Sequence, residues 1–98
     1  MNKAHAINAI TKHSDAIRSF GVQHLYLFGS TARGDGGSGS DVDIFVDLSR
    51  GVKFSLFDLM DLRRYLGRIL GARADVFPRR GLHRVIRRDI EREAIRVF

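Results

Sequence analysis

The stretch FGSTARGDGGSGSDVDIFVDL, residues 28–48, decides the fold of this chain. It begins at the end of one apolar and aromatic run, residues 24–28, and closes with a second run, residues 42–48. Short apolar runs bounded by glycine are typical of buried strands. Residues 34–40 contain four glycines in seven positions and predict a loop inside one domain rather than a domain boundary.

The flanking sequence predicts helices around these two strands. Apolar residues recur at roughly helical spacing over about residues 3–20, 56–70 and 82–90. Residues 72–77 predict a third strand, ended by the only proline, and a short fourth strand could follow at 94–98. The order of elements predicts an α/β (α+β) fold, with a small mixed sheet of three to four strands flanked by three helices.

Length and composition limit the classes of protein that the chain can represent. Its 98 residues form one domain, residues 1–98, and a net charge of +6 comes from 17 basic and 11 acidic side chains. The absence of cysteine excludes a disulfide framework, a thiolate zinc site and a cysteine nucleophile. Apolar runs are too short to cross a bilayer, and residues 1–10 lack an apolar signal core. By elimination we expect a cytoplasmic protein without a membrane partner.

The turn after the first strand offers a place for phosphate. Gly29 has no Cβ, so backbone N–H groups there can approach a phosphate closely, and Ser30 adds a hydroxyl donor. Arg33 lies three residues further on and can present a planar guanidinium. Taken alone, Gly-Ser is a common dipeptide, and an ordinary strand-ending turn explains it equally well.

Acidic residues on the second and third predicted strands suggest a metal site. Asp41 and Asp43 are two apart, so they point to one face of a strand with Cα atoms roughly 7 Å apart. Their oxygens could share Mg²⁺ with a polyphosphate, although an exposed strand edge is the alternative. Asp75 would join them if its strand lies alongside, or it could pair with Arg73 or Arg79. Asp47, roughly 13 Å beyond Asp43, is interpreted as structural or surface.

The spacing of these residues resembles a known family. Gly29-Ser30, ten residues, then Asp41-Val42-Asp43 is similar to the Gly-Ser-x10-Asp-x-Asp signature of the DNA polymerase β-like nucleotidyltransferases. The run from Phe28 to Ile44 resembles the minimal nucleotidyltransferases, or MNT proteins, which form the antitoxin half of HEPN–MNT toxin–antitoxin pairs. Asp75 matches the third carboxylate of that family. The glycine-rich residues 36–39 depart from the larger polar or proline-containing segment that the family often carries.

This resemblance implies a nucleotidyltransferase fold, an activity and a set of roles. It implies a type VII-like antitoxin that moves AMP from ATP to a tyrosine hydroxyl of a cognate HEPN RNase toxin and so silences it. Two Mg²⁺ ions would be held by Asp41, Asp43 and Asp75, of which Asp75 would also activate the acceptor hydroxyl. The nucleotide would be bound by Gly29, Ser30, Arg33 and Ser40. Two alternatives are an antitoxin that acts by binding alone and a transferase with a small-molecule acceptor.

The last twenty residues are rich in arginine. The simplest interpretation of residues 79–98 is a solvated helix face, and the sharper one is a docking surface for an acidic partner or operator DNA. Because no base-reading motif is present and stacking aromatics are few, DNA binding by this chain alone is not expected. The resemblance implies the toxin and ATP as partners, with a homo-oligomer or a hetero-oligomer with the toxin as the candidate assembly.

Overall fold

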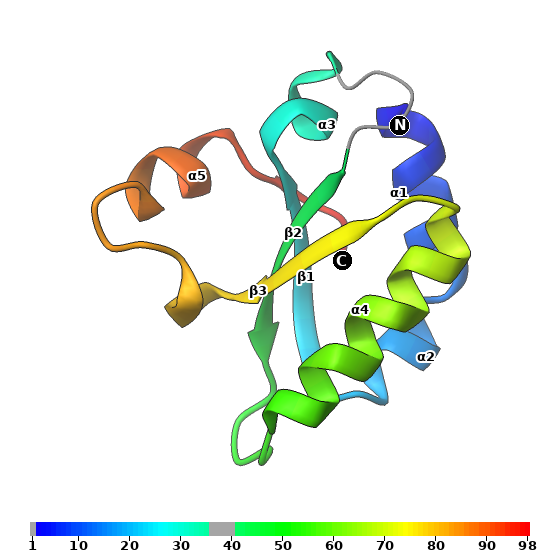
Figure 1. Cartoon of the computed structure of the whole chain (residues 1–98), viewed down its shortest axis with the longest axis vertical. Coiled ribbons are helices and arrows are strands. Elements are labelled where there is room, and N and C mark those ends of the chain that lie inside the picture. The colour runs from blue at the N-terminus through cyan, green and yellow to red at the C-terminus, as the bar shows by residue number, and fades with distance from the viewer. Residues whose placement is uncertain (1, 36–40) are drawn as a thin grey trace.

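The computed structural model of the chain describes residues 2–35 and 41–98, and its central feature is a four-stranded sheet (Figure 1). The elements in chain order are α1 (Lys3–Lys12), α2 (Ser14–Arg18), β1 (Val22–Phe28), α3 (Gly29–Arg33), β2 (Val42–Leu48), α4 (Leu56–Leu70), β3 (Ala74–Pro78), a 3-10 turn (Arg79–Gly81), α5 (Arg87–Glu93) and β4 (Ile95–Arg96). None of the helices in these ranges is long and apolar enough to cross a membrane.

The sheet is mixed, as the order of elements predicted. Its strands lie in the order β3-β2-β1-β4, with β1 antiparallel to both β2 and β4 and with β2 parallel to β3. A parallel pair needs a crossover connection, which α4 supplies. The ends of α4 agree with the sequence: Ser55 and Asp58 form a capping box, and Gly71 ends the helix with a φ of +67°.

The two faces of the sheet carry different cores. The main core lies on the face covered by α1, α2 and α4 and includes Leu25, Leu27, Ile44, Val76 and other buried residues. The opposite face carries a smaller cluster built on Phe28, Phe45 and Leu82, which the segment leading to α5 covers. Figure 1 shows α5 on the other side of the sheet from α4. Because strand side chains alternate, Asp43, Phe45 and Asp47 all belong to this second face.

The helices differ from the sequence prediction in three places. The N-terminal helix breaks at His13, which leaves helical geometry with φ −112° and ψ 18° while its ring Nδ1 lies 2.8 Å from the carbonyl of Ala9. Residues 29–33, expected as a turn, form the short helix α3. The last helix begins at Arg87 rather than at residue 82, because Leu82 adopts an extended conformation and packs under Phe28 and Phe45. The described residues thus contain five α-helices where three were predicted.

Candidate active site

Gly29 begins α3 directly after β1 and lies against Asp43. Its φ is +70°, a left-handed conformation that side chains with a Cβ rarely adopt. A Cβ on Gly29 would lie well inside 3.0 Å of the Asp43 carboxylate, closer than real Cβ atoms approach other atoms. The backbone conformation therefore favours glycine here, and any side chain at this position would displace the Asp43 carboxylate.

The sheet register places two of the predicted acids side by side. Asp43 of β2 is the register partner of Asp75 of β3, so their Cα atoms are neighbours across a parallel pair about 4.8 Å apart. Asp41 precedes β2 and is exposed. The Nε of Arg73 lies 4.0 Å from Asp41 Oδ2 and 3.8 Å from Asp75 Oδ1, so this arginine stands between the two carboxylates.

The electrostatics of Asp43 follow from this placement. Partial burial, then the charges of Asp75 and Asp41, raise the pKa of the Asp43 carboxyl above its usual value, and Arg33 opposes the shift only weakly. A cation at this position would remove the repulsion. Residues 2–35 and 41–98 hold no group of three His, Asp or Glu side chains close enough to bind a metal by themselves. Asp41, Asp43 and Asp75 therefore do not converge on one point in this structure. The carboxylates still suit Mg²⁺, which takes few protein carboxylates and completes its shell with substrate oxygens and water.

The N–H groups of Gly29 and Arg33 that were expected to bind phosphate donate hydrogen bonds to a residue that the sequence did not indicate. Glu93 of α5 accepts hydrogen bonds from the backbone N–H of Gly29 at 3.3 Å and from Nη1 of Arg33 at 3.4 Å. Arg33 Nε also donates to Asp35 at 3.4 Å, and Asp35 and then Glu93 raise the pKa of the guanidinium. Glu93 is 64 residues from Gly29, and no local pattern could have linked them. Ser40, another predicted nucleotide contact, lies outside the described residues.

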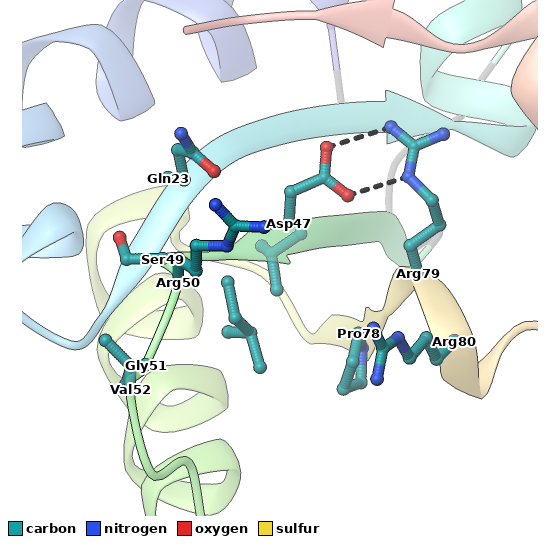
Figure 2. Close-up of a pocket in the computed structure, with 11 residues that line it drawn as sticks. Gln23, Asp47, Ser49, Arg50, Gly51, Val52, Pro78, Arg79 and Arg80 are labelled. Carbon is teal, nitrogen blue, oxygen red and sulfur yellow. Dashed lines mark hydrogen bonds and ion pairs between the residues drawn. The ribbon is translucent and has the colours of Figure 1, made fainter.

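The opposite end of β2 holds an ion-pair network instead of a reactive site. Asp47 accepts from Arg79 Nε at 2.7 Å and from Nη2 at 2.9 Å, as Figure 2 shows, and Arg79 also pairs with Glu91. The guanidinium lies 4.9 Å from the ring centres of Tyr26 and Phe45. These hydrogen bonds lower the pKa of Asp47, in agreement with its interpretation as a structural residue.

Two hollows adjoin this face of the sheet. The larger, about 650 Å³, lies at the Asp47 end, and the residues around it include Gln23, Ser49, Arg50 and Arg80 (Figure 2). The smaller, about 340 Å³, lies beside Asp43. Its lining residues are Phe28, Asp43, Phe77, Gly81, Leu82, His83, Ile86 and Ile90. Of the predicted site residues that the structure describes, Asp43 lines the smaller hollow, and none lines the larger one.

The arginine-rich C-terminal segment is partly used inside the molecule. Arg79 belongs to the network with Asp47, and Arg87 donates from Nη2 to the carbonyl of Arg80 at 3.3 Å. Arg92 lies 3.8 Å from Asp89 in an exposed pair of little energetic weight. Docking of an acidic partner on the remaining arginines stays a prediction, and DNA binding by this chain alone is still not expected.

Comparisons with known proteins agree with this geometry. The family model of the nucleotidyltransferase domain matches residues 10–97. The protein adenylyltransferase MntA of Thermococcus cleftensis is 36% identical over 89 residues, which cover 90% of this chain and 88% of that protein. The solved structure of a provisionally named minimal nucleotidyltransferase has a TM-score of 0.73 at 31% identity and covers 97% of this chain and 95% of its own.

A further solved structure shows the same fold at lower identity. It is a complex of a tri-AMPylated HEPN toxin of Shewanella oneidensis with its MNT antitoxin, and the similar chain has a TM-score of 0.69 at 19% identity. The match covers 95% of this chain and 71% of that one. From the domain match over residues 10–97 and the likeness to MntA, the chain belongs to the minimal nucleotidyltransferases of the nucleotidyltransferase domain family and is a nucleotidyltransferase enzyme.

Proposed function

We propose that this nucleotidyltransferase moves AMP from ATP to a tyrosine hydroxyl of a HEPN toxin in a Mg²⁺-dependent reaction, and that it acts in this way as a cytoplasmic antitoxin. The observation that carries the proposal is the pairing of Asp43 with Asp75 directly beside the Gly29 turn. The protein adenylyltransferase name of the Thermococcus relative and the AMPylated toxin bound to the Shewanella antitoxin support the same reaction and partner.

Each residue has a proposed role in binding ATP. The backbone of Gly29, the hydroxyl of Ser30 and the guanidinium of Arg33 hold the triphosphate, together with Ser40. The triphosphate then replaces the Glu93 carboxylate as the acceptor for Gly29 and Arg33. Asp41, Asp43 and Asp75 hold two magnesium ions. When bound, these ions neutralise the charge of the triphosphate and of the departing pyrophosphate. Carboxylate oxygens are the ligands that magnesium prefers, and the register that sets Asp43 opposite Asp75 brings two of them side by side.

The transfer step needs an acid that accepts the proton of the acceptor. The tyrosine oxygen forms a bond to the α-phosphorus, the bond from that phosphorus to the bridging oxygen breaks, and pyrophosphate leaves with the electron pair. The proton of the hydroxyl passes to the Asp75 carboxylate. Asp75 suits this role because it lies on the edge strand β3 and its side chain keeps 33% of its surface exposed, so a partner can approach it.

The deciding experiment measures transfer to a cognate HEPN partner protein. The purified partner is incubated with ATP and Mg²⁺, and its intact mass is followed for added adenylyl groups. We expect the wild type to add this mass. Asp75→Asn should be slower by roughly 10²–10⁴-fold, because it keeps the shape but loses the proton acceptor. Asp89→Asn, an exposed acid on α5, is the matched control and should leave the rate unchanged.

Two outcomes would contradict the proposal. If the wild type adds no mass yet still neutralises the partner, the chain works by binding alone. If ATP binds equally well in EDTA and in Mg²⁺, as calorimetry would report, the assignment of the three acids to magnesium fails.

A further inference from the structure

The small hollow beside Asp43 is bounded by two layers of the fold. Phe28 and Phe77 come from neighbouring parts of the sheet face, with ring centres 6.3 Å apart and planes tilted by 50°. Leu82, Ile86 and Ile90 come from the segment that covers this face. Ile86 is 48% exposed, so it lies at the mouth of the hollow rather than in its floor.

Two of the residues that line this hollow have polar side chains, Asp43 and His83. The carboxylate of Asp43 is the acidic group among its lining residues. His83 is exposed, and its Nδ1 already accepts the backbone N–H of Val85 at 3.2 Å. Apart from His83, the side chains of the wall are aromatic and aliphatic, with a single carboxylate on the side of the Gly29 turn.

The polarity of this wall distinguishes the two planar groups that take part in the reaction, the purine of ATP and the phenol ring of tyrosine. A purine carries polar nitrogens around its whole edge, and a largely apolar wall would leave buried ones without hydrogen-bond partners, which is unfavourable. A phenol ring is apolar except for one hydroxyl at its tip. Its shape and polarity therefore match a hollow with apolar walls and one acidic end.

We infer that this hollow is the acceptor subsite, which binds the phenol ring of the partner's tyrosine with its hydroxyl toward Asp43 and Asp75. The inference rests on the proposed function, since it names where the acceptor of that reaction sits. The register allows this direction: Phe77 is two residues beyond Asp75 on the same face of β3, so a ring lying on Phe77 can reach the paired acids with its tip. Phe28 immediately precedes Gly29, which brings the ring site next to the triphosphate turn.

The first test measures binding without any transfer. 4-Methylphenol, which reproduces the tyrosine side chain, is titrated into the protein while methyl NMR signals are recorded. We expect the methyl signals of Leu82, Ile86 and Ile90 to shift, with a dissociation constant in the millimolar range. Adenosine should leave them unmoved. If adenosine shifts these signals and 4-methylphenol does not, the hollow takes the nucleobase and the inference is wrong.

The second test uses a matched pair of exposed positions. Ile86→Trp covers the mouth of the hollow, whereas Val85→Trp adds the same ring at a neighbouring residue that is 78% exposed and does not line it. In the mass assay, Ile86→Trp should raise the KM for the partner about tenfold or more and leave the KM for ATP unchanged, and Val85→Trp should change neither. A raised KM for ATP, or equal behaviour of the two variants, would overturn the inference.

The two tests separate this inference from the proposed function. If the wild type never transfers AMP but 4-methylphenol still binds among these methyl groups, the reaction is wrong and the phenol site stands. If transfer proceeds normally, Ile86→Trp leaves it unaffected and 4-methylphenol shifts no signal, the reaction stands and the acceptor lies elsewhere.

Discussion

Replacing Gly29 by alanine tests whether the glycine turn and Asp43 act as one unit. The new side chain must adopt a φ of +70°, which costs an alanine about 1–2 kcal/mol. Gly71 ends α4 with a φ of +67° and has no atom within 4 Å of a built Cβ, so Gly71→Ala imposes the same backbone strain without a clash. At about 4–8 °C per kcal/mol, both variants should lose roughly 4–16 °C in Tm.

Both variants should lose similar stability, but only Gly29→Ala should also lose transfer activity. Its Cβ overlaps the end of the Asp43 side chain, which can rotate away, so the clash adds little to the loss of stability. The carboxylate is then displaced from the position facing Asp75, and a displacement on the order of 1 Å can lower a rate about 100-fold. We expect at least that loss in the mass assay for Gly29→Ala and less than a roughly twofold loss for Gly71→Ala, both measured well below their Tm values.

The comparison has a clear refuting result. If the two variants lose stability equally and also transfer equally well, the position of the Asp43 carboxylate does not depend on the bare glycine. The inference that Gly29 positions the Asp43 carboxylate would then be wrong, even if both residues remain necessary.

Two further predictions concern the charged residues of the same sheet face. Burial and the charges of Asp75 and Asp41 raise the pKa of Asp43 above its unfolded value of 3.8, so the wild type loses stability as pH rises from that value through the raised pKa. Asp43→Asn removes this loss, so the Tm of the variant should rise relative to that of the wild type as the pH increases above about 4. A difference in Tm that stays constant with pH would count against the shift. Arg79→Ala removes the hydrogen bonds to Asp47 and the ring contacts, so we expect a loss of about 1–3 kcal/mol in thermal unfolding with the transfer rate unchanged. An unaltered Tm would show that the network adds nothing to stability.

Elements with local signals could be predicted, and those decided by packing could not. The bounds of α4 follow from its apolar stripe, its capping box and Gly71, and the structure has the same bounds. The break at His13 has no such signal, because apolar spacing continues on both sides of it. Leu82 fits a helical pattern with Ile86 and Ile90. In the structure its backbone is extended, and its side chain packs against the aromatic side chains of the sheet.

The candidate site shows the same division. The spacing of Gly29, Ser30 and the first two acids is visible in the sequence, and so is a lone acid in the third strand. That Asp75 stands directly opposite Asp43 depends on the register of a parallel pair, which spacing alone does not determine. The contact of Glu93 with Gly29 depends on where α5 packs, 64 residues later.

The order of strands also has a consequence for how the chain acquires its site during synthesis. The first strand to leave the ribosome, β1, becomes a central strand, and the edge strands β3 and β4 are made after it. Contacts between residues far apart in sequence form late, because loop-closure entropy must be overcome first. An unfinished chain can hold the Gly29 turn and Asp43, but it lacks Asp75 until the crossover is complete and Glu93 until α5 has emerged. We therefore expect the reactive centre to form late in folding, after β3 and α5 have taken their places.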